Sequence, residues 1–162
     1  MPRAERLPDA PAARRTHRVV LDTNACLDLL VFSSQRSGAL RDLLAGGQLQ
    51  AVTRADCRDE WRRVLRYTTL ALDAHRCTEL EAAYDTLMLD VGTAPAGNVA
   101  RLPRCKDPDD QKFLELARDA GASLLLTRDA ELLVLARRTA RAGLFRIAAP
   151  VDVMAALAEL DR

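Results

Sequence analysis

The sequence has few aromatic residues, few histidines and no paired metal-binding cysteines. Aromatic residues make up 4% of the 162 residues, so the chain has few rings from which to build a base-stacking platform for single-stranded nucleic acid. Its four cysteines are widely spaced and form no CxxC pair, which argues against a zinc ribbon or a thioredoxin-type site. We expect His17 to lie in a tail and His75 to begin a helix, so neither is a candidate catalytic residue.

Long apolar runs and targeting segments are also missing. No run is long enough to span a bilayer, and residues 1–17 lack the apolar stretch of a secretory signal. Glu5 and Asp9 argue against an organelle transit peptide. We therefore expect a cytoplasmic protein with reduced thiols and no membrane association.

Charge of one sign is not in excess either, since the net charge is +1. All but two of the 24 basic residues are arginine, the exceptions being Lys106 and Lys112. The planar guanidinium group is well suited to phosphate. A GC-rich genome explains the same bias, and we favour that simpler explanation for the composition.

Short apolar runs alternate with helical patterns along the chain. The runs typical of buried strands cover residues 18–21, 49–53, 123–127 and 145–148. Helical patterns cover residues 25–32, 36–45, 54–67, 73–89, 108–120, 130–141 and 151–160, and we expect Thr53 to cap the third of them. Residues 92–97 predict a loop, and residues 98–105 an extended segment.

This alternation predicts a three-layer α/β/α sandwich with a central, mostly parallel sheet. Residues 1–17 are rich in Pro, Ala and Arg without periodicity, so we expect a disordered tail there, followed by one domain over residues 18–162. In open α/β sheets, ligands bind beyond the carboxyl ends of the strands. Asp22 and Thr127 lie at two such ends, so a site is expected at that rim.

Acidic side chains gather at these strand ends and helix starts, although each also has a simpler structural explanation. Asp22 and Asp129 can each cap a helix. Glu60 lies among arginines on a helix and can form local ion pairs there. Segment 107–110 has three carboxylates in four residues, more than capping needs, and they repel one another unless a cation neutralises them. Because hard cations such as Mg²⁺ and Mn²⁺ prefer oxygen ligands, the acids together predict a cation site.

Four pieces of the sequence resemble the PIN-domain family. Residues 19–24 (VVLDTN) resemble the opening of the family's domain, and residues 107–117 (DPDDQKFLELA) resemble the helix with its third acid. Residues 125–129 (LLTRD) resemble its later strand and fourth acid, and Glu60 sits where the second acid is expected. The resemblance runs from Arg18 to Ala156. Within the family, the pattern is most similar to bacterial proteins described as toxin components of toxin–antitoxin systems.

The resemblance implies a PIN-like sandwich and a Mg²⁺- or Mn²⁺-dependent endoribonuclease, a hydrolase of RNA phosphodiester bonds. The catalytic, metal-binding acids would be Asp22, Glu60, Asp110 and Asp129, with Asp107 as a further metal ligand and Asn24 and Thr127 as polar supports. The implied partners are RNA, an antitoxin protein and a second copy of the chain. Candidates to hold the RNA backbone are Arg62, Arg63, Arg101, Arg104 and Arg128.

Three alternatives compete with this interpretation. A haloacid-dehalogenase-like phosphatase would carry a second Asp two residues after the first, where this chain has Asn24. A response-regulator receiver would need a lysine after a late strand, and both lysines lie elsewhere. The third alternative is a catalytically silent PIN-like protein that binds RNA or a partner, and the presence of all four acids argues against it.

Overall fold

The structure is a computed structural model, and it describes residues 15–93 and 100–162. Its centre is a five-stranded sheet in the order β3-β2-β1-β4-β5, in which every pair of neighbours is parallel. The strands are β1 (His17–Leu21), β2 (Leu49–Thr53), β3 (Leu89–Asp90), β4 (Leu124–Leu126) and β5 (Arg146–Ala148). The prediction of a parallel α/β sheet is therefore confirmed.

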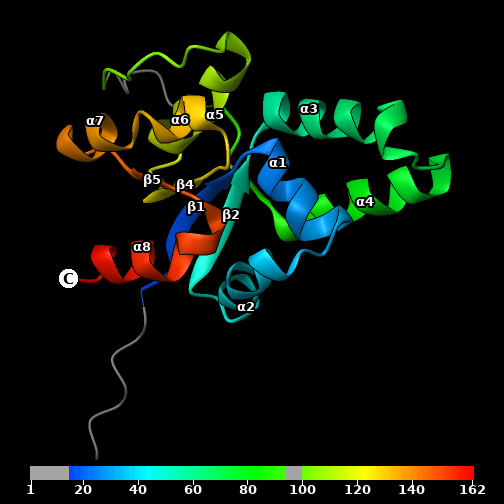
Figure 1. The fold of residues 1–162 in the computed structure, drawn as a ribbon, viewed down its shortest axis with the longest axis horizontal. Helices are drawn as coiled ribbons and strands as arrows, with labels where there is room; N and C mark the ends of the chain where they lie inside the picture. Colours follow the sequence, from blue (N-terminus) through cyan, green and yellow to red (C-terminus); the bar gives the residue numbers. More distant parts are fainter. Residues whose placement is uncertain (1–14, 94–99) are drawn as a thin grey trace, which may run out of the picture.

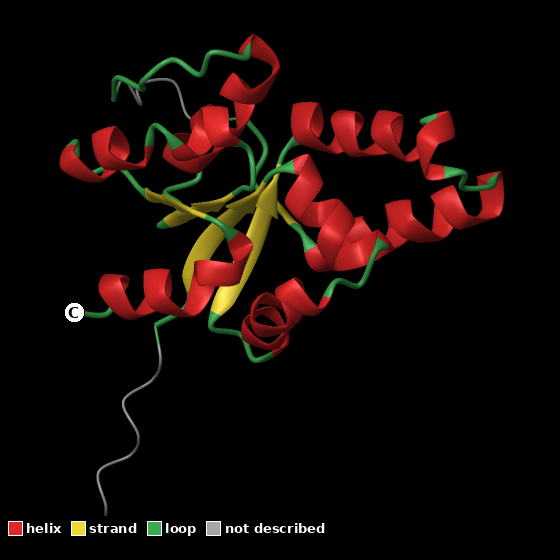
Figure 2. Ribbon diagram, in the orientation of Figure 1, coloured by secondary structure: helices red, strands yellow, loops and turns green. Residues whose placement is uncertain are grey.

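Helices cover both faces of this sheet (Figures 1 and 2). They are α1 (Thr23–Cys26), α2 (Gly38–Ala45), α3 (Ala55–Leu65), α4 (Ala74–Leu87), α5 (Gln111–Asp119), α6 (Ala130–Leu133), α7 (Ala136–Arg141) and α8 (Val153–Leu160). A π-helical turn at Leu27–Val31 extends α1, and 3₁₀ turns occupy Gln35–Ser37, Thr68–Leu70, Pro108–Asp110 and Pro150–Asp152. None of the helices in the described ranges is long and apolar enough to cross a membrane.

Side chains from the two faces of the sheet form two separate apolar cores. Val19 and Leu21 point to one face, where they join α1, α2, α4 and α8. Val20 and Leu125 point to the other, where they meet α5 and α6. This alternation follows from the two-residue period of a strand, and it produces the three layers. The four cysteines are all buried and free.

Helix α3 begins just beyond the carboxyl end of β2 (Figure 1) and contributes to both cores. Its Trp61 and Leu65 pack with the first core, while Cys57 packs with the second. Trp61 stacks on Tyr84 of α4, with ring centroids 5.4 Å apart. Glu60, next to Trp61 in the sequence, is thereby held near the carboxyl ends of the strands.

Several local expectations differ from the structure. Strand β1 begins at His17, whose ring is buried and contacts Asp161 and Ser123, so the expectation that His17 lies in the tail is wrong. Residues 1–14 of the expected tail lie outside the described residues, as do residues 94–97 of the expected loop and 98–99 of the expected extended segment. Residues 100–105 form no strand.

The cap of α3 also differs from the prediction. The Thr53 hydroxyl does not cap this helix but hydrogen-bonds the Tyr84 hydroxyl at 2.6 Å, and Arg54 occupies the N-cap position. The helix predicted over residues 130–141 is divided into α6 and α7. The sequence does not predict strand β3, because a two-residue strand has no periodicity to detect.

Candidate active site

Asp22 lies where the strand order of the sheet reverses. Strands β1 and β4 are neighbours, with Leu21 paired to Leu126, although the chain runs from β1 to β2 on the other side. Asp22 and Thr127 follow these two strand ends directly. A reversal point of this kind leaves a crevice beyond the carboxyl ends of the strands, and ligands bind there in open α/β sheets.

Hydrogen bonds fix the carboxylate of Asp22. One oxygen accepts a hydrogen bond from the Ala25 N–H at 2.8 Å, so Asp22 does cap α1, and the other accepts the Thr127 hydroxyl hydrogen. Asp22 is 4% exposed, and Thr127 is fully buried. Thr127 thus holds the Asp22 carboxylate by a direct hydrogen bond.

The same threonine positions Asp129. The Asp129 N–H donates to the Thr127 hydroxyl oxygen at 2.9 Å, and the Asp129 carboxylate caps α6 by accepting from Glu131 N–H at 2.9 Å. One buried hydroxyl therefore connects the carboxylate that follows β1 to the backbone of the aspartate that follows β4.

Asp107 and Asp110 lie on either side of the turn that opens α5. Asp107 accepts from Asp109 N–H at 2.9 Å and caps a 3₁₀ turn that begins with Pro108. Asp110 ends that turn and makes no side-chain cap. Capping therefore uses Asp107 and leaves the Asp110 carboxylate for other contacts.

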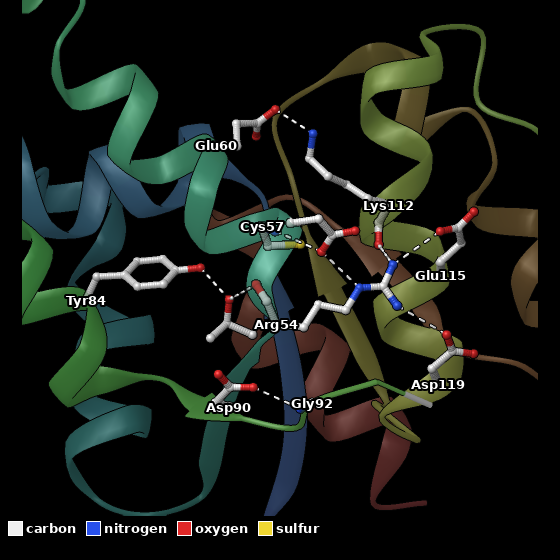
Figure 3. Close-up of polar contacts among 11 residues, drawn as sticks. Arg54, Cys57, Glu60, Tyr84, Asp90, Gly92, Lys112, Glu115 and Asp119 are labelled. Carbon is white, nitrogen blue, oxygen red and sulfur yellow. Dashed lines mark hydrogen bonds and ion pairs between the residues drawn. The ribbon is translucent and has the colours of Figure 1, made fainter. Parts of the chain in front are cut away.

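Glu60 reaches the site from α3, and both of its carboxylate oxygens have partners. One accepts from the Thr23 hydroxyl. The other accepts from Lys112 Nζ at 2.7 Å, the contact drawn in Figure 3. The side chains of Glu60 and Lys112 are 12% and 17% exposed. Arg63 approaches the same carboxylate at 3.8 Å.

One cavity brings all of these acids together. Its volume is about 360 Å³, and the lining includes Asp22, Glu60, Asp107, Asp110, Asp129 and Asn24. Asn24 is exposed on the first turn of α1. The side chains that the sequence suggested as one site thus come from four separate segments to the same rim of the sheet.

Comparison with known proteins agrees with this architecture. A family model described as PIN domain matches residues 18–131, more than half of the chain. The chain belongs to the PIN-domain family. Members of this family are generally nucleases that act on RNA. No curated protein and no solved structure gives a significant match.

Two carboxyl groups of this PIN domain are difficult to ionise. Burial raises the pKa of Asp22 to about 6, although the hydrogen bonds from Thr127 and Ala25 oppose this effect. The pKa of Asp110 is raised to about 7 by burial, by its hydrogen bond with Asp129, and by the charges of Asp129, Asp107 and Asp22. In the described part of the chain, no lysine or arginine forms an ion pair with Asp22, Asp107, Asp110 or Asp129.

These donors have the chemistry of a site for a hard cation. They are all oxygen atoms, without histidine or cysteine, which suits Mg²⁺ or Mn²⁺ better than zinc. A divalent cation would also remove the mutual repulsion that raises the pKa of Asp110. Among residues 15–93 and 100–162, no three acidic, His or Cys side chains already surround one point as metal ligands do. Glu60, held by Thr23 and Lys112, would have to turn toward an ion.

Sequence reasoning missed three polar residues around the acids. Thr23 and Lys112 hold Glu60, and Arg54 fixes α5 against α3 through Glu115, Asp119 and the Lys112 carbonyl oxygen (Figure 3). Lys112 offered a signal, since it is one of two lysines and lies two residues after Asp110. Arg54 offered none, because its partners are about 60 residues away in the sequence.

Proposed function

We propose that this chain is a divalent-metal-dependent endoribonuclease that hydrolyses phosphodiester bonds of RNA. The supporting observation is the single cavity lined by five carboxylates, four of which have no cationic partner among the described residues. Leaving such a group of like charges unpaired is unfavourable. The pKa values of Asp22 and Asp110 are raised by burial first and by the neighbouring carboxylates in addition. Capping accounts for Asp22, Asp107 and Asp129 one at a time. It does not require them to share one cavity with Asp110 and Glu60, whereas a site for Mg²⁺ or Mn²⁺ does.

The proposed roles follow from the position of each side chain. Asp22, Asp110 and Asp129 would bind the cation, with Glu60 and Asp107 completing the site from α3 and from the turn before α5. A bound cation would lower the pKa of water and stabilise the charge that develops on the phosphate. Thr127 keeps Asp22 and Asp129 in register, and Asn24 offers an amide to the substrate.

Two of the candidate arginines are better placed for the RNA backbone than the other three. Arg101 and Arg104 are exposed, and they line a second cavity of about 660 Å³ that also includes Pro108 and Gln111 from the turn and helix start beside Asp110. Within the described ranges neither forms an ion pair. Arg128 is paired with Asp28 at 2.7 Å, Arg62 with Asp85 at 3.6 Å, and Arg63 lies beside Glu60.

The biological role proposed here is that of a toxin component of a toxin–antitoxin system, acting in the cytoplasm. Support comes from the sequence resemblance to that branch and from the four buried thiols, which suit a reducing compartment. An uncontrolled ribonuclease is harmful, so an antitoxin protein or self-association would have to restrain it. Induced expression should arrest growth, and Asp110→Asn should remove the arrest if cleavage causes it.

The biochemical test is RNA cleavage by chelator-treated protein during titration with Mn²⁺ or Mg²⁺. Cleavage should require the cation, stop with excess chelator and be absent in Asp110→Asn. RNA binding without cleavage at any cation concentration would instead support the catalytically silent alternative.

A further inference from the structure

The cavity that contains the acids has a second wall of different chemistry. This wall is formed by Leu27, Val64, Tyr67 and Leu70, which come from the π-helical turn after α1, from α3 and from the 3₁₀ turn that follows α3. Leu27 is buried, and Val64 and Leu70 are partly buried and pack against the first core. The carboxylates and these apolar side chains therefore line the same space of about 360 Å³.

Tyr67 is the ring on this wall, and its exposure is unusual for this protein. Trp61, Tyr84, Phe113 and Phe145 are each less than 5% exposed, whereas Tyr67 is 49% exposed. Phe32 is exposed to 58%, but it does not line the cavity of the acids. Of the two rings that line this cavity in the described part of the chain, Phe113 is buried, so only Tyr67 is accessible to a ligand.

The backbone on both sides of Tyr67 is fixed. Its N–H donates to the Val64 carbonyl oxygen at 3.0 Å as α3 ends, and its own carbonyl oxygen accepts from Leu70 N–H at 3.1 Å. The Tyr67 hydroxyl makes no hydrogen bond to any residue in the described ranges. The ring is therefore presented by a well-defined turn, and no polar contact of its hydroxyl explains its position.

We propose that this wall is a nucleobase subsite, in which a base next to the scissile phosphodiester stacks on the Tyr67 ring. The inference rests on the proposed ribonuclease function and adds the part of the substrate that the carboxylates cannot bind. A phosphate held by a cation at the acids leaves its attached nucleoside beside the apolar wall, because the two walls share one cavity. Bases have apolar faces that stack on aromatic rings, and this contact tolerates different base identities.

Three variants separate stacking from other roles of Tyr67. In Tyr67→Ala, the affinity for a short labelled RNA should fall about 10- to 100-fold, the range expected for loss of one base–aromatic stack. Tyr67→Phe should bind like the wild type, since the ring remains and the hydroxyl has no partner among the described residues. Phe32→Ala is the matched control, because it removes an exposed ring outside the cavity, and its affinity should not change. Affinities are measured with Mn²⁺ and a non-hydrolysable RNA analogue, so that the proposed cation site keeps all of its acids and the RNA stays intact.

Abasic RNA gives the deciding comparison. A set of oligonucleotides is prepared, each lacking the base at one position. The oligonucleotide that lacks the stacked base should bind the Tyr67-containing protein about 10- to 100-fold more weakly than intact RNA does. At that position, Tyr67→Ala should cause no further loss. The proposal would be overturned if Tyr67→Ala and its parent bound intact RNA with equal affinity. It would also be overturned if Tyr67→Ala lowered the affinity for every abasic RNA as much as it lowers the affinity for intact RNA. Binding is measured separately from cleavage. A wild type that binds RNA without cleaving it would therefore refute the proposed ribonuclease function, while the binding data would still decide whether a base stacks on Tyr67.

Discussion

Two groups of carboxylates lie beside α5, and they differ in whether a basic side chain neutralises them. Asp56, Glu115 and Asp119 surround the Arg54 guanidinium, at 2.9, 3.2 and 3.2 Å. Burial raises the pKa of Asp56, but the hydrogen bond and charge of Arg54 outweigh it and lower the pKa below its usual value. In the cavity, burial and, after it, the neighbouring carboxylates raise the pKa of Asp110 to about 7, so these neighbours add to the effect of burial instead of opposing it.

The difference separates a structural group of acids from the group for which we propose a cation site. The Arg54 group has its own positive charge and ties α3 to α5. Among the described residues, the only ion pairs of the cavity group are those of Glu60 with Lys112 and Arg63. The charge of Arg128, which is paired with Asp28, has only a small effect on Asp22. The two groups should therefore respond differently to mutation, pH and metal.

The largest effect is expected on activity in Asp22→Asn and Asp110→Asn. Each change keeps the shape of the side chain and removes one charge from the proposed cation site, so Mn²⁺-dependent RNA cleavage should fall about 100-fold or more. Thermal stability in chelator at neutral pH should not fall and should rise for Asp22→Asn, because the neutral amide avoids the cost of ionising a buried carboxyl group and its oxygen can still accept from the Ala25 N–H. Cleavage at the wild-type rate would remove that carboxylate from the proposed mechanism.

The second effect is a pH dependence of stability without metal. A raised pKa means that folded Asp22 and Asp110 retain protons that the unfolded chain releases. Their stabilising contribution is therefore complete below about pH 4 and is lost as the pH rises through about 6 to 7. For Asp22, the loss is up to roughly 3 kcal/mol. Chemical unfolding in chelator, at a series of pH values from about 4.5 to about 8, measures it.

The double variant Asp22→Asn, Asp110→Asn is the control for this slope. It should be less sensitive to pH over the same range, because neither group can titrate. An identical slope in the wild type and the double variant would contradict the assignment of the pH dependence to the cavity. Saturating Mn²⁺ should also flatten the wild-type slope, since a cation favours the ionised carboxylates.

The third effect is on the partnered group. Arg54→Met leaves three carboxylates without their cation, and it should lower the free energy of unfolding by about 2 kcal/mol. We expect a smaller loss of stability than for a fully buried network, because Asp56 and Glu115 are nearly half exposed and water screens their charges. Arg76→Met, which breaks an exposed pair with Glu79, should cost about 0.5 kcal/mol or less. Equal losses in the two variants would show that the Arg54 network is not structural.

The smallest effect concerns Glu60, which shares features of both groups. Lys112→Met removes its closest cationic partner and should lower stability in chelator by about 1 kcal/mol. Mn²⁺ should then raise the melting temperature more in this variant than in the wild type, because Glu60 no longer has to leave an ammonium group to meet the ion. Lys106→Met, at an 82% exposed lysine, should leave the Mn²⁺-induced shift unchanged. If Lys112→Met also leaves the Mn²⁺-induced shift of the melting temperature unchanged, Glu60 is not a ligand of the cation.

The fold could be predicted because its signals are local. The runs at residues 18–21, 49–53, 123–127 and 145–148 are apolar enough to be buried on both faces, and each lies within one residue of an observed strand at both ends. The segment Asp107-Pro108 marks the start of a helix through a cap and a proline, and the structure has a 3₁₀ turn there that leads into α5. Strand β3 and the break between α6 and α7 have no comparable local pattern.

The sequence by itself determined the parallel α/β sheet and placed acids at strand ends and helix starts, because periodicity and capping act over a few residues. Only the tertiary structure decided which acids are unpaired. Arg54 could have neutralised any nearby carboxylate, and the chain topology placed it beside Glu115 and Asp119. The same topology brought Asp22, Asp110 and Asp129 together without an ion pair to a lysine or arginine of the described residues. It likewise left Tyr67 exposed in the same cavity and buried Trp61 six residues earlier. Charge pairing and burial depend on residues far apart in the chain, so no local pattern in the sequence records them.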